Sequence, residues 1–300
     1  MEIGLVTYTP EKVKGYDHHV YYSKWVNGSV FPAAEEMQND VSCFCDAKAI
    51  RENPSIVAIS KNGPALRKNR KTNLAFDYVC PTNQEYRTKV LEYIKELNTQ
   101  NILGVTLNLY HFPEQEFCVC PRCVELWRTS GLNWYDWRAQ EVTGFLKEVK
   151  GVIGGKPLYV NLLPDPVLGR ERFGYDFDAL AEYTDTFVIP MFSKAYPSPW
   201  YWEMLARAFK SKLKKPVFAN LYVRGPNDDP KQTPPVKDLL TVAVRIARAG
   251  IDGIIFLAEN ADRIRNFQKE ATQATDVLQE LDGYGGDEVL DLVEKWKSLF

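Results

Sequence analysis

The sequence has no long apolar run. Within its 300 residues, none approaches the ~18 apolar residues that a membrane-spanning helix needs. The first residues, Met1 to Val6, also lack the basic segment followed by an apolar one that marks a secretory leader. We therefore expect a cytoplasmic protein with no membrane partner.

The sequence also lacks an excess of charge of one sign. Lys and Arg number 37 and Asp and Glu number 39, which gives a net charge of -2 at pH 7. Such a balance provides no overall attraction to polyanions, so we expect no nucleic-acid partner. The basic run at residues 67–71 is interpreted as a solvated loop, with a contact to RNA or phosphate as the alternative.

What the sequence does contain is a regular alternation of short apolar runs and amphipathic segments, which is typical of parallel βα units. Eight apolar runs are predicted to be strands, at residues 3–9, 41–45, 74–80, 102–112, 157–163, 186–192, 216–223 and 253–258. Helices are predicted at residues 30–37, 84–97, 134–149, 176–183, 200–212 and 236–249. Thr82 or Asn83 can cap the helix at 84–97, and Gly250 can end the one at 236–249.

Eight alternations favour a closed barrel over a doubly wound sheet. The chain length also suits this fold, which typically takes roughly 250 residues. We predict an α/β protein, a (β/α)8 TIM barrel, as a single domain over residues 1–300 with an inserted loop at about 46–73 and C-terminal helices at about 262–300. Enzyme sites in this fold lie at the C-terminal ends of the strands, so candidate residues are sought there.

Three carboxylates follow predicted strands. Glu114 and Glu116 come after the fourth strand, and Glu259 comes directly after the eighth. Two separated carboxylates that face a cleft can act as acid, base or nucleophile on a glycosidic bond. We predict that these three residues are catalytic, with Glu259 and Glu114 as acid/base and nucleophile. The alternative is that each caps a helix or pairs with an arginine.

Other polar and aromatic residues near strand ends are predicted to bind a carbohydrate or another small polar substrate, since flat aromatic faces stack on sugar rings. They are Tyr8, Asn108, His111, Asp165, Trp200, Tyr222 and Arg224. His111 could equally be a buried structural histidine.

Cysteines are few but clustered, six in all, and three of them form a Cys-x-Cys-x-x-Cys segment: Cys118, Cys120 and Cys123. Thiolates at this spacing can converge on one ion, and a structural zinc site needs a fourth ligand. Cys80 or Cys45 can supply it, because each ends a predicted strand and the C-terminal ends of neighbouring parallel strands lie on the same face. We predict a structural zinc ion. An iron–sulfur cluster, buried free thiols and a solvent-open catalytic metal are the alternatives.

Several motifs carry a resemblance to a known family. The run from Asp77 to Arg87, which contains Cys-Pro-Thr-Asn-Gln-Glu-Tyr-Arg, resembles glycosyl-hydrolase-like TIM barrels, and the run from Asn108 to Pro113 with the cysteine segment looks like a block of the same family. The run from Gly250 to Ile255 is similar to the last strand of these proteins. The motifs cover roughly residues 75 to 130, and the resemblance implies a barrel that acts on carbohydrate or descends from proteins that do.

This chain departs from that family at two positions. Asn108 stands where the family has Asp, and His111 where it has Arg. An amide cannot act as a nucleophile or base, so Glu114, Glu116 or Glu259 must substitute, or the barrel binds carbohydrate or nucleic acid without catalysis. The zinc site of tRNA-guanine transglycosylases is a second, weaker resemblance, because that site is completed by a later histidine and none follows His111.

Overall fold

The computed structural model describes residues 1–300, and its strands form a closed eight-stranded parallel barrel. The strands follow one another around the barrel in the order β1 (Glu2–Thr7), β10 (Gly253–Ala258), β9 (Val217–Arg224), β8 (Thr186–Met191), β7 (Leu158–Asn161), β6 (Gly104–Asn108), β3 (Gln38–Ser42) and β2 (His18–Lys24). This confirms the predicted TIM-barrel fold class.

Helices follow every barrel strand except the first two. They are α1 (Ala47–Glu52), α2 (Gln84–Asn98), α3 (Pro121–Ser130), α4 (Trp134–Ile153), α5 (Gly169–Phe173), α6 (Phe177–Ala181), α7 (Pro199–Lys212), α8 (Val236–Arg248), α9 (Ala261–Gln273), α10 (Thr275–Leu281) and α11 (Asp287–Lys297). Short 3-10 turns lie at η1 (Pro54–Ile56) and η2 (Pro230–Gln232). None of the helices combines the length and the apolar character that crossing a membrane requires.

The predicted strand at residues 74–80 is wrong, and the barrel strand β2 was missed. Residues 74–80 form no strand of the barrel; Tyr78 and Val79 make only isolated bridges, to Cys45 and Val57. The barrel instead uses β2, which is buried from Val20 onward although it begins with two histidines and ends in a lysine. Polar residues at both ends hid this strand from an apolar-run criterion.

The predicted helix at residues 30–37 is also wrong. Pro32 interrupts the segment, and Glu36 has a φ of 53°, outside the right-handed helical region. The side chain of Asn39 accepts a hydrogen bond from the Ala34 backbone N–H at 2.9 Å and donates to the Ala34 carbonyl at 3.0 Å. These bonds hold the connection between β2 and β3 in an irregular conformation.

The chain divides into two compact units by its internal contacts. The first comprises Met1–Tyr22, Leu162–Pro166 and Thr186–Phe300, and the second comprises Ser23–Asn161 and Val167–Asp185. The barrel strands come from both units, with β2 shared between them.

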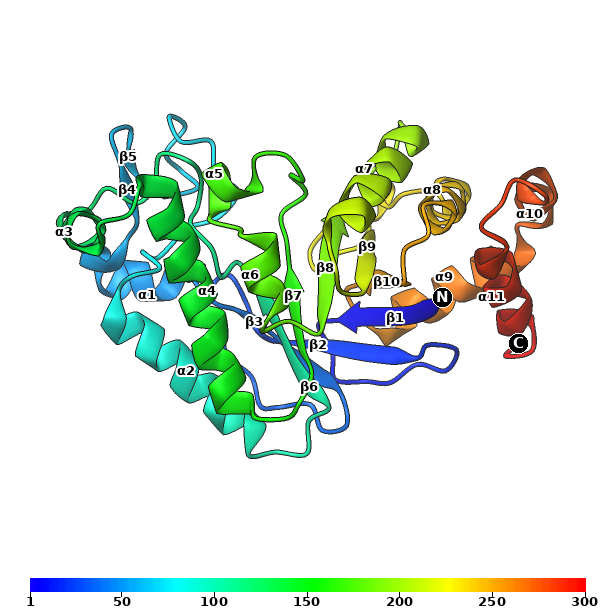
Figure 1. Ribbon diagram of the computed structural model, residues 1–300. Coiled ribbons are helices and arrows are strands. Elements are labelled where there is room, and N and C mark those ends of the chain that lie inside the picture. Colours follow the sequence, from blue (N-terminus) through cyan, green and yellow to red (C-terminus); the bar gives the residue numbers. More distant parts are fainter. The chain divides into compact units, whose positions relative to one another are not determined.

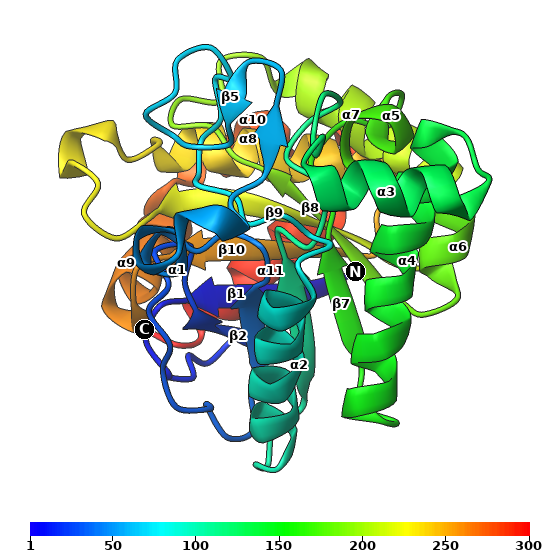
Figure 2. The ribbon, with the colours of Figure 1, turned by 90° about the vertical axis from the view of Figure 1, so that its left-hand side faces the viewer.

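In the first unit, β9, β10 and β1 run side by side (Figure 2). All six residues of β10 are buried, as expected for a strand covered on both faces. The ring of Phe256 on β10 packs 5.1 Å from Phe267 of α9 and 6.2 Å from Trp296 of α11. An aromatic core thus joins the C-terminal helices to the strands.

In the second unit, α2 and α4 lie side by side (Figure 1). The side chain of Asn83 accepts a hydrogen bond from the Tyr86 backbone N–H at 2.9 Å and so caps α2, as one of the two predicted alternatives. Arg87 of α2 forms a bidentate pair with Glu148 of α4, each contact 2.8 Å, and its guanidinium lies over the ring of Phe145. The predicted insertion contains α1, η1 and a hairpin of two antiparallel strands with two residues each, β4 (Ile59–Ser60) and β5 (Gly63–Pro64).

Candidate functional site

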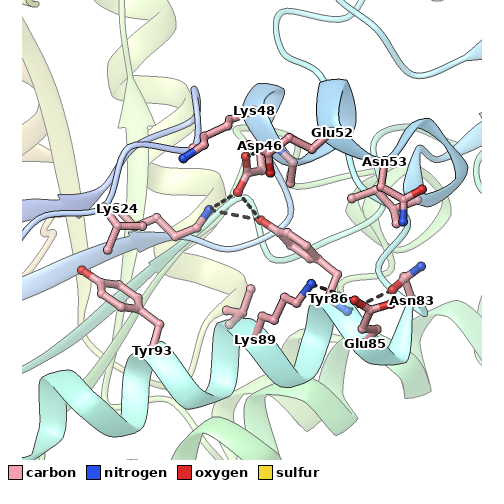
Figure 3. Close-up of a pocket in the computed structure, with 15 residues that line it drawn as sticks. Lys24, Asp46, Lys48, Glu52, Asn53, Asn83, Glu85, Tyr86, Lys89 and Tyr93 are labelled. Carbon is pink, nitrogen blue, oxygen red and sulfur yellow. Dashed lines mark hydrogen bonds and ion pairs between the residues drawn. The ribbon is translucent and has the colours of Figure 1, made fainter.

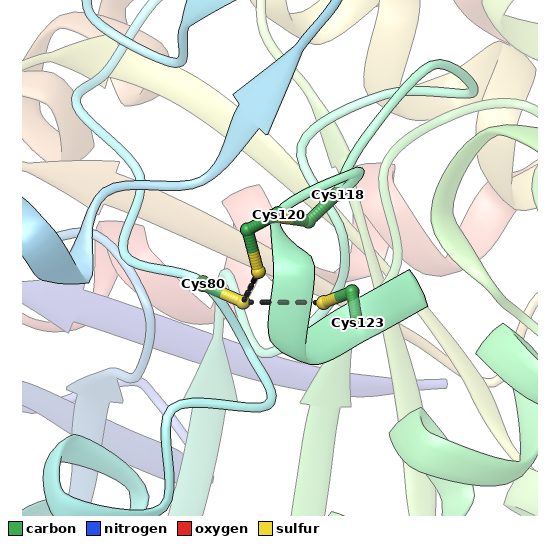
Figure 4. A group of neighbouring side chains, drawn as sticks. All are labelled: Cys80, Cys118, Cys120 and Cys123. Atoms are coloured by element: carbon green, nitrogen blue, oxygen red, sulfur yellow. Dashed lines mark hydrogen bonds between the residues drawn. The ribbon is translucent and has the colours of Figure 1, made fainter. Parts of the chain in front are cut away.

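Four cysteines of the second unit converge on one point (Figure 4). The sulfur atoms of Cys80, Cys118, Cys120 and Cys123 all lie within 4.8 Å of one another, and all four residues are buried. The Sγ of Cys80 is 3.4 Å from that of Cys123 and 3.9 Å from that of Cys120. This group could bind a metal ion.

The local structure explains why these thiols meet. Cys120 is the N-cap of α3, Pro121 begins the helix, and Cys123 lies in its first turn. The N-terminus of a helix carries partial positive charge, which favours thiolates there. Hydrogen bonding, chiefly with Cys118, lowers the pKa of the Cys80 thiol to about 7. A soft cation would complete the neutralisation of this group.

Cys45, the other predicted fourth ligand, lies outside this group. It is fully buried, pairs with Tyr78 through an isolated backbone bridge, and its thiol pKa is raised by burial. Cys43 is likewise buried, and its thiol lies 3.4 Å from the Val41 carbonyl. The structure therefore separates four clustered thiols from two isolated ones.

The cysteine segment is attached to the insertion by backbone hydrogen bonds. The Ile59 N–H donates to the sulfur of Cys118 at 3.2 Å, and the Val119 N–H donates to the Ile59 carbonyl at 2.7 Å. The Cys80 N–H donates to the Ile56 carbonyl at 2.8 Å. An ion bound by the four sulfurs would therefore join the insertion to α3.

In the first unit, Glu259 follows β10 directly, as predicted. One of its oxygens, Oε1, accepts a hydrogen bond from Arg224, the last residue of β9. Both side chains are about one-fifth exposed, at 19% for Glu259 and 21% for Arg224. Oε2 of Glu259 has no hydrogen-bond partner, so this carboxylate carries one free oxygen at the end of the strand.

A second polar group surrounds Tyr222, two residues before Arg224. Its hydroxyl donates to Asp228, and its backbone N–H donates to the hydroxyl of Tyr196 at 2.7 Å. Lys194 donates to Asp228 at 3.0 Å and to Gln232 at 2.9 Å. These contacts connect the segments that follow β8 and β9.

In the second unit, Glu114 is held by arginine. Arg172 donates to both of its oxygens, at 2.9 and 3.1 Å from Nε, and Arg138 donates to its backbone carbonyl at 2.8 Å. Burial raises the pKa of Glu114, but the hydrogen bonds from Arg172 outweigh burial and leave this pKa below its ordinary value. Glu116 is half-buried, and its carboxylate makes no hydrogen bond or ion pair.

His111 is fully buried, and its Nδ1 donates to the Phe112 carbonyl at 2.7 Å. Burial lowers its pKa to about 4, and the rings of Phe173 and Tyr175 stand 5.2 and 5.4 Å away. This environment matches the structural alternative stated for His111. Asn108 is half-buried at the end of β6.

The remaining predicted residues belong to the first unit. Tyr8 follows β1 and stacks on Tyr22 with 4.5 Å between ring centroids. Trp200 is 62% exposed at the start of α7. Asp165 is half-buried in the turn after β7, where its N–H donates to the Leu163 carbonyl at 2.7 Å.

Two partners of these residues were missed at the sequence level. Arg172, which binds Glu114, lies 58 residues away in the chain, and Asp228 lies in an irregular segment after β9. The run Arg170-Glu171-Arg172 after a predicted strand end was the available signal for the first. No comparable signal marked Asp228.

No protein-family model and no curated protein sequence matches this chain. Among solved structures it is similar to alpha-L-fucosidase isoenzyme 2 from Paenibacillus thiaminolyticus, with 13% identity, a TM-score of 0.60, and coverage of 91% of this chain and 50% of that one. It is also similar to the beta-galactosidase from the psychrophilic Marinomonas ef1, with 10% identity, a TM-score of 0.58, and coverage of 96% and 61%.

The chain thus spans about half the length of the fucosidase and about three fifths of the galactosidase. At these identities the likeness concerns the fold alone, and it agrees with the TIM barrel described above.

Proposed function

We propose that this chain hydrolyses glycosidic bonds of a carbohydrate substrate at the C-terminal ends of its barrel strands. The observation that carries the proposal is Glu259, which follows β10, pairs with Arg224 through one oxygen and keeps the other free. The fold likeness to two chains named as a fucosidase and a galactosidase supports the choice of substrate class.

The environments of the three glutamates suggest different roles. The ion pair with Arg224 orients the carboxylate of Glu259 at the strand end, where we propose that it acts as a nucleophile or as a base that activates water. Glu116, half-buried in the second unit, is kept as a separate catalytic candidate. Glu114 of the same unit, whose two oxygens are both bound by Arg172, is the less accessible candidate of the two. In the overall reaction, water adds its OH to the anomeric carbon and its proton to the leaving-group oxygen.

The test is turnover of 4-nitrophenyl glycosides and short oligosaccharides by the full chain. We expect Glu259→Gln to lower kcat at least 100-fold, since general acid–base groups typically contribute about 10²–10⁴-fold. Glu280→Gln, on an exposed surface pair with Lys237, is the matched control and should leave kcat unchanged. A parent protein that turns over no glycoside, or a Glu259→Gln variant with the parent's kcat, would refute the assignment.

One observation favours a second candidate function. Asn108 occupies the end of β6, where the family that the sequence resembles has an acid. The candidate is a barrel that binds carbohydrate without cleaving it. It predicts saturable binding of oligosaccharides without product, weakened when the exposed Trp200 is changed to Ala.

We also propose that the four clustered cysteines hold a structural zinc ion. Zinc with Zn–S bonds of about 2.3 Å places its sulfurs about 3.8 Å apart in a tetrahedron, close to the 3.4 and 3.9 Å separations found here. Four thiolates leave no coordination position for water, which indicates a structural role. The reduced thiols fit a reducing compartment such as the cytoplasm.

Metal analysis of the purified protein tests the zinc proposal. We expect one zinc ion per chain, lost in Cys120→Ser and retained in Cys43→Ala, whose cysteine lies outside the group. Iron in place of zinc, or no metal at all, would contradict it. We further propose that residues 1–300 are one barrel domain, because the closed barrel takes its strands from both units.

A further inference from the structure

A cavity of about 450 Å³ opens in the second unit between the β2–β3 connection, α1 and α2 (Figure 3). It exists because residues 25–37 form no helix, so part of α2 lacks the neighbour that a regular βα unit would supply. Cavities of about 300–1,000 Å³ are the usual size of small-molecule sites. Glu259 and the clustered cysteines do not line it.

The floor of the cavity is a buried polar triad. The Lys24 ammonium donates to the Ser42 carbonyl at 2.9 Å, to the Tyr86 hydroxyl at 3.2 Å, and pairs with Asp46 at 3.2 Å. The Tyr86 hydroxyl donates to Asp46 at 2.8 Å, and the other Asp46 oxygen accepts from the Ala49 N–H. Because these groups satisfy one another, the floor is a rigid platform with no charge left to attract an ion.

The charges on the walls also balance. Lys24 and Asp46 form one pair, and Lys89 and Glu85 form another at 2.7 Å. The two remaining charges, Lys48 and Glu52, have opposite signs. A cavity with three positive and three negative side chains has no net charge that would select an anion or a cation.

What the walls offer instead is unused hydrogen-bonding capacity of both kinds. The side-chain oxygen of Asn53 accepts hydrogen bonds from Ser55, and that of Asn83 accepts one from the Tyr86 N–H. Their amide nitrogens, and the Lys48 ammonium, remain available as donors to a ligand. The Glu52 carboxylate adds acceptor oxygens to the same lining. Figure 3 shows Lys48 and Glu52 above the Tyr86 ring and Asn83 below it.

Apolar side chains complete the lining. Val30, Ile56 and Val90 add aliphatic surface to the Tyr86 and Tyr93 rings. The cavity has no net charge, offers hydrogen-bond donors and acceptors side by side, and has an apolar wall. These properties suit a molecule with hydroxyl groups on its edge and C–H groups on its face. We propose that this cavity binds a neutral polyhydroxylated ligand of mono- to disaccharide size, at a site separate from the proposed hydrolytic residues.

The experiment measures binding to the full chain by calorimetry and saturation-transfer NMR. The probes are D-glucose, D-galactose, L-fucose, N-acetyl-D-glucosamine, lactose and cellobiose, with inorganic phosphate and acetate as anionic probes. Lys48→Met with Asn53→Ala removes two wall donors, and both residues are exposed, so folding should persist. Lys147→Met, in a different cavity of the same unit, is the control.

We expect at least one sugar to bind the parent and its dissociation constant to rise at least tenfold in the double variant. Binding should be unchanged in Lys147→Met, and the double variant should keep the parent's turnover of 4-nitrophenyl glycosides, which separates this site from the proposed function. Absence of sugar binding, equal affinity in the double variant, loss of turnover in the double variant, or competition by phosphate or acetate would overturn the proposal.

Discussion

Two regions of the molecule are stabilised in different ways. In the first unit, α8, α9 and α11 pack through apolar residues, among them the fully buried Trp296, whose ring lies 5.9 Å from Phe267. In the second unit, the insertion at residues 46–73 has no strand longer than two residues and is linked by hydrogen bonds to Cys80 and to the cysteine segment.

The difference shows where each region's stability comes from. Burial of aromatic and aliphatic surface stabilises the helical layer without any ligand. The insertion buries fewer large side chains in regular elements, so we expect its order to depend on the metal ion proposed at the four clustered cysteines. We therefore expect the two regions to respond to different perturbations.

Removing the proposed metal ion should cause the largest loss of stability. A structural metal supplies several kcal/mol of folding free energy, so we expect a strong chelator to lower Tm by about 10 °C or more. Loss of order in the insertion should open the basic run at residues 67–71 to trypsin. Differential scanning fluorimetry and mass spectrometry of the tryptic fragments measure these two effects.

The control for metal removal is the pair Cys120→Ser and Cys43→Ala. The first changes a clustered thiol and should reproduce the chelator effect, whereas the second changes an isolated one and should remain chelator-sensitive. If both variants keep the parent Tm and its trypsin resistance, the insertion does not depend on the cluster.

Truncating a side chain in the aromatic core of the first unit should cause the second-largest loss of stability. Trp296→Ala removes a fully buried ring that also donates to the Gly15 carbonyl at 3.1 Å. Such truncations cost about 3–5 kcal/mol. Urea unfolding with and without chelator should give the same loss, because the helical layer contains none of the clustered thiols. If the loss of unfolding free energy in Trp296→Ala disappears after chelation, the two regions unfold as one cooperative unit and the contrast between them fails.

The third prediction concerns acid sensitivity. Burial lowers the pKa of His111 to about 4, whereas an unfolded histidine titrates near 6.5. The unfolded chain therefore gains the proton first, so stability falls as pH decreases from 6.5 to 4, by about 3 kcal/mol for this shift. His111→Gln should flatten that part of the curve of unfolding free energy against pH.

His19 of the first unit is the matched control for His111. Burial also lowers its pKa, but the residue is only partly buried, and its Nε2 lies 2.9 Å from the Val13 carbonyl. We expect His19→Gln to change the pH curve less than His111→Gln does. An unchanged curve in His111→Gln would place the acid sensitivity in other groups.

The same contrast explains how much the sequence could predict. The strands β9 and β10 and the helix α8 were predicted within a few residues, because their burial produces continuous apolar runs and a one-sided helical pattern. The cap of α2 was predicted as either Thr82 or Asn83, and the structure selects Asn83, whose side chain bonds to a backbone N–H three residues later. Interactions between residues close in the sequence are enough to predict these elements.

The second unit was harder to predict. Residues 74–80 are mostly apolar like a barrel strand, yet only Tyr78 and Val79 pair, with Cys45 and Val57, and the true strand β2 has polar ends. Which extended segment joins a barrel depends on contacts distant in sequence. The same holds for the fourth cysteine: Cys45 and Cys80 were equivalent candidates until the fold brought only Cys80 to the cluster.

We expect the smallest loss of unfolding free energy when a single ion-paired glutamate is neutralised, and one such glutamate can be compared in each region. Glu203 of the first unit binds Arg207 at 2.8 Å and Arg245 at 3.2 Å, whereas Glu114 of the second is bound by Arg172 through both oxygens. Burial raises the pKa of each carboxyl, but arginine hydrogen bonds outweigh it and leave both pKa values lowered. Each pair therefore stabilises the fold at neutral pH and ceases to do so as pH falls through the lowered pKa.

Both carboxylates are partly solvent-exposed, so we expect Glu203→Gln and Glu114→Gln each to cost about 1 kcal/mol or less at pH 7. The cost of Glu114→Gln should be the larger, since bidentate pairing is lost in a region with less apolar support. Urea unfolding at a series of pH values below 7 measures both, and the differences from the parent should shrink as the pH falls. A larger cost for Glu203→Gln would mean that the helical layer relies on charge as much as the insertion does, and the contrast between the regions would fail.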